Sequence, residues 1–580
     1  MLNNKKKVLS ISKFSNTHME DVDLYLGPWC TNIDYFMNNI DKFIIKDINN
    51  NKDYFKFFKL ELENTYEYFL ENIVEVLNNI HSVKYSQSFW KILTIDWFYS
   101  VSPIFHYYYN AIDKIKNKNY FVQIDDSIYP FEKMSQFHIE KMEDSDIAVV
   151  QHSMISFIVK NISNSLLEYE YKNINYSKSS DFIRLTRKPK PKLLKKLFWT
   201  CVNKKKSKIL SYGLHSLNKF DMLQLSSIKN GISFKYKDEI NINYKQSGKR
   251  TKLLDNLEVV DFQSMLYAYL ISILPTTLLE EFDRFIANSN DYINKNTVVL
   301  EQSFFQDEVL FEVALAKEVN SAKIVCSQSG GYGMAEYYTG SMFSFEASDY
   351  FLSWGYNYMN KYNTNFISVP MALTSDGYNI HDRKYDDILF LMNEMSITFY
   401  YHTNINDGFG PFFLLKNFSN YIKENNKNIF NSLKFKVHPG RIGKTLEETF
   451  LDNLKFEYNM HDDDNITIKN CALVVTDYIG TSLLQCMKYN TPIILIYNDK
   501  TSLVTDEFMI HLKNFKDVGI LFTSYEEAAK QVINIYYNLN NYWNSISVQT
   551  ARRKFIKEYV LYEKNWKNVL LKTLNEIKDV

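Results

Sequence analysis

The stretch 473–497 constrains the fold of this chain more than any other part of the sequence. It reads as a buried strand, a polar turn, a short helix and a second buried strand, in the order LVVTD, YIGTS, LLQCMKYNT, PIILIY. This alternation is typical of an α/β protein with an open parallel sheet. Ligands of such sheets bind beyond the carboxyl ends of the strands, so the turn after the first strand is a candidate binding site.

This turn carries Gly480, Thr481 and Ser482 at the expected N-terminus of the helix. Free backbone N–H groups and the helix dipole favour an anion such as a phosphate there, and glycine permits close approach of the backbone. The alternative interpretation is an ordinary N-cap, because threonine and serine are common caps. The two interpretations are compatible, since both use the same N–H groups.

A second motif, His438-Pro439-Gly440-Arg441, directly follows an expected strand at 435–437. Proline cannot continue the strand, so the chain must turn and present the imidazole and guanidinium groups at the sheet edge. A cationic pair stabilises phosphate charge, and arginine can bind it through two hydrogen bonds. A turn with a solvated arginine is the alternative. Together, the two motifs predict a nucleotide-phosphate subsite.

Regular alternation of strands and helices begins near residue 296 and is interrupted by turn residues at 370–383. A chain of 580 residues is too long for one core, so two large domains are expected. We predict an N-terminal Rossmann-like domain with helical insertions over 1–375 and a nucleotide-binding Rossmann-like domain over 385–540. Helices over 541–580 are expected to pack back on the first domain.

A glycine-rich turn over 327–333, SQSGGYG, follows another expected strand. It is neither GxGxxG nor a P-loop, because no Lys-Ser/Thr pair follows. One interpretation is a tight turn. The other is the wall of a cleft, where Gln328 and Ser329 supply neutral hydrogen bonds and Gly330 and Gly331 let the backbone approach a ligand.

Transfer of a group to a hydroxyl usually needs a general base, and this is often an aspartate or a glutamate. Carboxylates at expected strand ends or in cleft loops are Asp125, Asp126, Glu301, Asp307, Glu308 and Glu336. Most of these are expected to be helix caps or surface charges. We select Asp126 and Glu308 as the candidate bases.

Composition excludes several classes of protein. The 67 basic residues balance 67 acidic ones, which argues against a dedicated nucleic-acid binder. Five scattered cysteines without CxxC spacing, and histidines without HExxH spacing, predict free thiols and no metal or other cofactor. The N-terminus lacks the apolar run of a signal peptide, and the apolar segment 92–112 is interrupted by Asp96 and His106. We therefore expect a cytoplasmic protein, soluble or peripheral.

The segment 187–208 differs in composition from the rest of the chain. It contains ten basic residues and two prolines, interleaved with leucines, Phe198 and Trp199. A solvated linker is one interpretation. The other is a basic amphipathic patch that touches an anionic membrane surface or a phospholipid-linked acceptor.

The order of several motifs resembles the sugar-transferase family of bacterial surface-polysaccharide clusters first catalogued in leptospires, a distant relative of the capsule-type Kdo and sialic-acid transferases. The matching stretches cover nearly the whole chain: LGPWC (26–30), SFWKILTIDWFYSVSPIFHYYYNAI (88–112), LPTTLLEEF (274–282), QSGGYG (328–333), FEASDYFLSWGY (345–356), GTSLLQCMKYNTPIILIY (480–497), ARRKFIKEYV…NW (551–566). Ser329 stands where the family pattern usually has histidine.

The resemblance implies a GT-B-like α/β fold, in which two Rossmann-like domains face a cleft. The C-terminal domain would hold the nucleotide-sugar donor, and Trp29 and the 328–331 turn would lie on the acceptor side. Relatives with a His-Pro motif and a Ser/Thr motif use CMP-activated keto-sugars without metal. By motif, phosphate and ribose contacts then fall on His438, Thr481 and Ser482.

We therefore expect a glycosyltransferase of surface-glycan assembly that moves a nonulosonate or Kdo-type sugar from CMP to a glycan or lipid-linked acceptor. An NDP-hexose transferase is the first alternative. A nucleotide-sugar epimerase or hydrolase on the same fold, and a non-catalytic scaffold, also remain open. The serine at position 329 is the feature that keeps the scaffold open.

Overall fold

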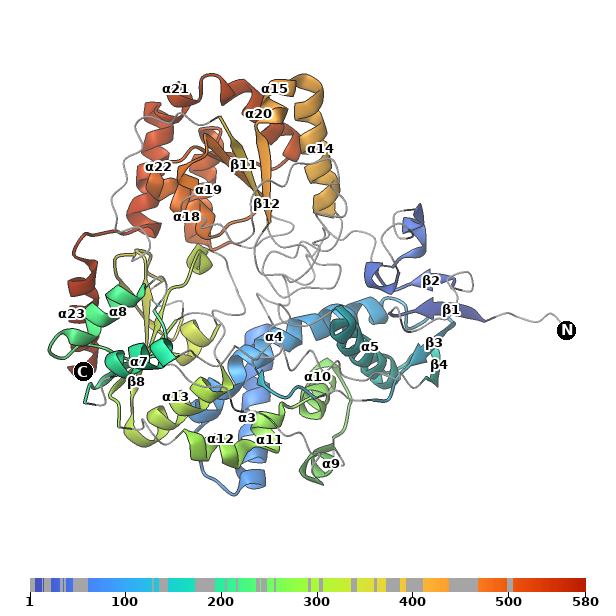
Figure 1. Cartoon of the computed structure of the whole chain (residues 1–580). Helices are drawn as coiled ribbons and strands as arrows, with labels where there is room; N and C mark the ends of the chain where they lie inside the picture. The colour runs from blue at the N-terminus through green and yellow to red at the C-terminus, as the bar shows by residue number, and fades with distance from the viewer. Residues whose placement is uncertain are drawn as a thin grey trace.

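The structure is a computed structural model of the whole chain (Figure 1). It describes residues 6–12, 14, 22–31, 35, 38–44, 61–127, 130–134, 144–172, 193–203, 206–214, 217–235, 240, 242, 248–254, 257–289, 294–301, 306–334, 342–358, 362–371, 386–392, 410–437, 468–497 and 504–579. Three parallel sheets organise these residues, with orders β2-β1-β3-β4, β10-β9-β8-β7-β5-β6 and β12-β11-β13-β14-β15. The expected α/β class is confirmed.

The C-terminal sheet is five-stranded, and helices cover it (Figure 1). Its strands are β11 (Ile388–Met392), β12 (Leu433–Val437), β13 (Leu473–Thr476), β14 (Ile493–Ile496) and β15 (Leu521–Phe522). Its helices are α14 (Gly410–Asn425), α15 (Lys427–Asn431), α18 (Thr481–Tyr489), α19 (Asp506–Asp517), α20 (Tyr525–Tyr536) and α21 (Leu539–Trp543). The central strands β13 and β14 are buried at every position. This is the pattern of strands covered on both faces, and it explains why their sequences are almost entirely apolar.

The middle sheet is six-stranded and belongs to the lobe below, which also contains long helices. Its strands are β5 (Ile209–Ser211), β6 (Ser233–Phe234), β7 (Thr297–Glu301), β8 (Lys323–Ser327), β9 (Tyr350–Ser353) and β10 (Asn365–Ser368). Helix α13 (Asp307–Asn320) connects β7 to β8, as the alternation after residue 296 predicts. Near the start of this sheet's sequence, α7 (Leu193–Val202) and α8 (Lys219–Ser227) accompany β5 and β6.

The N-terminal sheet of four strands is a separate sheet that the sequence interpretation did not separate from the middle one. Its strands are β1 (Lys7–Ser10), β2 (Leu24–Tyr25), β3 (Tyr120–Ile124) and β4 (Glu168–Tyr171). Strand β1 precedes β2 in the chain and pairs with both β2 and β3. Short 3-10 turns follow at Pro28–Cys30 and Ile40–Lys42.

Helices join the N-terminal and middle sheets (Figure 1). They are α3 (Leu62–His81), α4 (Gln87–Asp113), α5 (Asp144–Asn161), α9 (Gly248–Leu254), α10 (Phe262–Ser272), α11 (Thr276–Leu279) and α12 (Phe282–Asn288). The 27-residue α4 is buried on most of its surface and packs on α3, α5 and α13. A helix that is apolar all round belongs in a core. None of the helices described here combines the length and the apolar character that a bilayer crossing requires.

The chain ends with two helices that contact different sheets. Helix α22 (Ile546–Tyr559) packs on α18 and α19, and Arg552 donates a hydrogen bond of 2.7 Å to the Met487 carbonyl near the end of α18. Helix α23 (Trp566–Asp579) instead packs on the middle sheet, where Leu574 joins a buried cluster that contains Val299. The helical segment expected over 541–580 is therefore interrupted between Tyr559 and Trp566. The domain boundaries at 375, 385 and 540 stay predictions.

Candidate functional site

Two loops from the carboxyl ends of different sheets touch each other. Gly331 follows β8 of the middle sheet, and Gly480 follows β13 of the C-terminal sheet. A Cβ atom on Gly331 would lie 2.7 Å from both the Cα and the carbonyl carbon of Gly480. No side chain fits between the loops, so the two backbones are in direct contact. The carboxyl ends of the two sheets thus face one another, as the GT-B-like arrangement requires.

A second contact holds the two lobes together beside this point. The Thr505 N–H, at the start of α19, donates to the Met334 carbonyl at 3.2 Å. The Tyr358 hydroxyl donates to the Gly333 carbonyl and lies 3.3 Å from the Thr505 hydroxyl. Burial raises the pKa of Tyr358 well above its ordinary value, so this hydroxyl stays protonated and remains a donor.

Helix α18 begins without a side-chain cap. Its N-cap residue is Gly480, not Thr481 or Ser482, so the N-cap interpretation of the two hydroxyls is wrong. The backbone of Gly480 is extended, and a Cβ atom there would lie 2.7 Å from the Tyr478 ring. Because glycine has no side-chain oxygen, the N–H groups of the first turn receive no capping hydrogen bond from that position. They are the kind of donors that bind an anion.

The two hydroxyls of this first turn have different environments. Ser482 is buried, and its hydroxyl lies 2.7 Å from the hydroxyl of Tyr478, so it stabilises the turn before the helix. Thr481 is only partly buried. Next to them, Asp477 directly follows β13 and accepts a hydrogen bond of 2.9 Å from Tyr525, whose pKa burial and the nearby carboxylate raise well above its ordinary value.

The opposite loop is shaped by Gln328, which is 1% exposed. Its side-chain amide donates to the Gly330 carbonyl at 2.9 Å, and its side-chain oxygen accepts from the Trp354 N–H at 2.7 Å. Gly330 adopts a φ of +69°, a left-handed conformation that favours glycine. Gln328 therefore holds the loop that reaches Gly480. The structure thus gives Gln328 a positioning role, and its contact with a ligand, the cleft-wall interpretation of this turn, stays a prediction.

A carboxylate lies beside this loop. Glu301 ends β7, is partly buried, and accepts a hydrogen bond of 3.2 Å from the Ser329 hydroxyl. Its other oxygen lies against the backbone of Gly213, where a Cβ atom would be 3.1 Å away. Glu301 was one of six carboxylates considered from the sequence and was not one of the two selected. Its position at a strand end was the only signal that could have favoured it.

The pattern of the whole chain decides its family. The model of the LIC12162 family of transferases matches residues 8–574. The chain belongs to this family. No curated protein matches the sequence significantly.

Solved glycosyltransferase structures are similar to this LIC12162 family transferase at low identity. For the spinosyn forosaminyltransferase SpnP the identity is 7% and the TM-score 0.30, with 51% of this chain and 79% of that chain covered. For the glycosyltransferase of kitacinnamycin the identity is 9% and the TM-score 0.31, with 52% of this chain and 84% of that chain covered. For the glycosyltransferase VinC in complex with dTDP the identity is 10% and the TM-score 0.29, with 53% of this chain and 77% of that chain covered. Similarities of this size support no assignment of donor or acceptor.

The two carboxylates of this LIC12162 family transferase that the sequence analysis selected as candidate bases lie in different surroundings from Glu301. Asp126 follows β3 of the N-terminal sheet, is 62% exposed and pairs with Lys160. Glu308 is fully buried in the first turn of α13, where it accepts from Lys133 at 2.7 Å and from the Ile240 N–H at 2.6 Å. The structure brings neither residue into contact with the Gly331–Gly480 junction, and a base role for either stays a prediction.

Trp29 is almost fully buried in the transferase. Its indole N–H donates to the Ile11 carbonyl at 3.0 Å, and its ring packs edge-on against Tyr108 with ring centroids 5.3 Å apart. These contacts belong to the core beside the N-terminal sheet. His438, Arg441 and Glu336 lie outside the described residues, so their predicted roles keep the status of predictions. Among the residues that are described, no group of three or more histidines, cysteines or carboxylates could hold a metal ion.

The junction between the two loops makes a first prediction about this transferase. Gly331→Ala should reduce the free energy of unfolding by about 1–3 kcal/mol, because the new methyl group would overlap backbone atoms that cannot rotate away. Gly248→Ala is the matched control, since nothing lies within 4 Å of a Cβ atom there, and its effect should stay within about 0.5 kcal/mol. Equal urea stability of the two variants would contradict a backbone-to-backbone junction.

Proposed function

We propose that this LIC12162 family transferase is a glycosyltransferase that binds a nucleotide-activated sugar between its middle and C-terminal sheets. The observation that carries the proposal is the junction of Gly331 with Gly480, which brings two strand-end loops together at one place. Beside this junction lie an uncapped helix start and a partly buried carboxylate. One group suits a leaving phosphate, and the other suits an attacking hydroxyl.

The proposed reaction is a direct displacement at the anomeric carbon. An acceptor hydroxyl forms the new C–O bond as the bond between the anomeric carbon and the phosphate oxygen breaks. The proton passes from the hydroxyl to Glu301, and the nucleotide leaves with the bonding electron pair. The first-turn N–H groups of α18 and the partly buried Thr481 stabilise the phosphate charge, with His438 and Arg441 as the predicted cationic partners.

Glu301 is our proposed base in preference to Asp126 and Glu308. It occupies the carboxyl end of a central strand, where ligands of open sheets bind, and Ser329 orients one of its oxygens. Glu308 already accepts two hydrogen bonds at one oxygen and is closed off from solvent. The serine at position 329, which departs from the histidine of the family pattern, thus has a role in positioning the base.

The preferred donor is a CMP-activated keto-sugar of the nonulosonate or Kdo type, because the His438 and Thr481-Ser482 motifs match those of CMP-sugar users. An NDP-hexose is second. The acceptor is proposed to be a hydroxyl of a glycan or of a lipid-linked sugar.

A thermal-shift experiment without metal tests the proposal, with CMP, CDP, UDP, GDP and ADP as ligands. We expect CMP to raise the melting temperature, and a ligand at 100 times its Kd adds about 2.7 kcal/mol to the folded state. His438→Ala should abolish the shift. A shift with UDP or GDP alone would replace the CMP donor by an NDP-hexose. Absence of any shift, or consumption of a nucleotide sugar without an acceptor, would overturn the transferase mechanism.

A further inference from the structure

A surface on α7 and α8 is not used by the proposed reaction. Three exposed apolar side chains lie on or directly after α8: Phe220, Leu223 and Ile228. Phe220 is 65% exposed, although large aromatic side chains are normally buried. We call these three residues, together with Lys206, Lys208, Lys219 and Lys229, the α8 surface.

Charge is strongly segregated in this part of the chain. Between residues 193 and 235 the sequence contains nine lysines and a single acidic residue, Asp221, whereas the whole chain has equal numbers of basic and acidic residues. Asp221 is buried and pairs with Lys567 of α23, so its negative charge is compensated within the fold. Lys235 pairs with the buried Glu312, but the structure exposes four other lysines around α8, so the α8 surface carries an excess of positive charge: Lys206, Lys208, Lys219 and Lys229.

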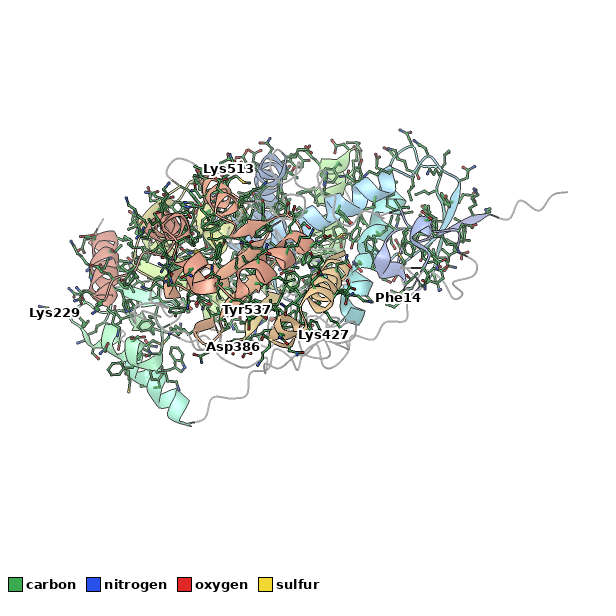
Figure 2. The ribbon with its side chains drawn as sticks, turned by 90° about the horizontal axis from the view of Figure 1, so that it is seen from above. Phe14, Lys229, Asp386, Lys427, Lys513 and Tyr537 are labelled. Atoms are coloured by element: carbon green, nitrogen blue, oxygen red, sulfur yellow. The ribbon has the colours of Figure 1, made fainter. Side chains whose placement is uncertain are left out.

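The structure places exposed lysines at both ends of α8. At its start, Lys219 lies over the Phe198 ring of α7, with its Nζ atom 5.9 Å from the ring centroid. At its end, Lys229 follows Ile228 directly, and Figure 2 shows it at one edge of the molecule. The Ser207 hydroxyl donates to the Gly231 carbonyl at 2.7 Å, which brings Lys206 and Lys208 close to the same end.

The helix itself is rigidly held, so it can present its apolar residues. Asn218 and Asp221 form a capping box at its start. Lys567 reaches from α23 to Asp221 and Gln224, and its Nζ atom lies 5.8 Å from the Phe220 ring centroid. Leu225 on the opposite face belongs to the buried cluster of the middle sheet.

We propose that the α8 surface binds a bilayer that contains anionic phospholipids. Segments that lie in a membrane interface typically have exposed apolar side chains surrounded by lysines. The apolar groups insert into the bilayer, and the lysines contact the anionic headgroups. A second group of exposed apolar residues makes the contrast. Leu166, Tyr169 and Tyr171 accompany β4, but Glu168 and Glu170 alternate with them. This strand mixes carboxylates with lysines, as in the Glu168–Lys6 pair, and therefore lacks the excess of lysines that surrounds α8.

The test is co-sedimentation of the full-length protein with vesicles of phosphatidylcholine, with and without phosphatidylglycerol. Binding should require phosphatidylglycerol and weaken as salt is raised. Each lysine near an anionic surface contributes about fivefold to the affinity, so Lys219→Glu/Lys229→Glu should lower it by at least about twentyfold. The control is Lys427→Glu/Lys513→Glu, which changes the net charge equally on the other lobe and should keep binding (Figure 2).

An apolar pair tests insertion separately from charge. Phe220→Ser/Leu223→Ser should lower vesicle affinity by at least about tenfold, since two apolar side chains no longer enter the bilayer. Ile510→Ser/Ile546→Ser changes two other exposed apolar residues, on α19 and α22, and this variant should bind as the wild type does. All variants should melt at the wild-type temperature.

The proposal is overturned if the protein does not bind the vesicles, or if the α8 variants and the control variants lose binding equally. It is also overturned if the protein binds RNA and not the vesicles. It does not depend on the glycosyltransferase mechanism, because the α8 variants should keep the nucleotide-induced shift in melting temperature.

Discussion

Glu301→Gln should lower kcat about 10²–10⁴-fold, the usual contribution of a general base, and should leave the KM for the donor nearly unchanged. Glutamine has the same shape and can still accept the hydrogen bond from Ser329, which is 3.2 Å from the carboxylate in the wild type. Only the ability to take a proton is lost. Steady-state kinetics with the donor identified by nucleotide binding measures the effect.

The matched variant for this prediction is Asp126→Asn, which removes one of the two candidate bases selected from the sequence. Asp126 lies at the end of a strand of a different sheet and is paired with Lys160 at the surface. If Glu301 is the base, as proposed, kcat of Asp126→Asn stays within a few-fold of the wild type. A large loss in this variant and a small one in Glu301→Gln would return the base to the N-terminal sheet.

Arg250→Met should reduce the free energy of unfolding by about 3–5 kcal/mol. The guanidinium is 3% exposed and makes two hydrogen bonds to Glu280, at 3.1 and 2.9 Å. It also donates to the carbonyls of Ser272 and Leu274, at 3.1 and 2.7 Å. Methionine fills a similar volume but leaves the Glu280 charge and two carbonyls unpaired in a buried place. Urea denaturation followed by tryptophan fluorescence measures the loss.

A second ion pair, next to Glu280 in the sequence, provides the control. Arg284 also pairs with a glutamate, Glu281, at 2.9 Å, but its side chain is exposed. Exposed pairs contribute at most about 1 kcal/mol, so Arg284→Met should be nearly neutral. A loss of less than about 1 kcal/mol in Arg250→Met would show that the buried pair is not important for stability. Adding Glu280→Leu should recover part of the lost stability, because it removes the unpaired charge.

The central strands of the C-terminal sheet could be predicted because β13 and β14 are almost entirely apolar and are bounded by turn residues, a pattern typical of buried strands. The N-terminal sheet was harder for the opposite reason. Strand β4 has the sequence EYEY and is exposed at every position, so no apolar pattern marks it. Strand β1 is only four residues long and begins with an exposed lysine. Both depend on pairing with β3, which local sequence does not encode.

The candidate site shows the same division. Its proposed phosphate side could be named from the sequence because Gly480, Thr481 and Ser482 are adjacent there. The partnership of Glu301 with Ser329 could not, because 28 residues separate them and only the pairing of β7 with β8 brings them together. Nor does the sequence distinguish a glutamine that contacts a ligand from one, such as Gln328, whose amide is used by its own backbone.

The position of α23 has a consequence for how the protein is synthesised. The last strand of the middle sheet ends at Ser368, but Leu574 and its neighbours, which complete the core behind β7 and β8, come after the whole C-terminal sheet. A ribosome makes the C-terminal lobe before the earlier lobe can close its core. Until then α23 does not cover the apolar surface around Val299 and Val325, and exposed apolar surface of this kind makes a folding intermediate prone to aggregation.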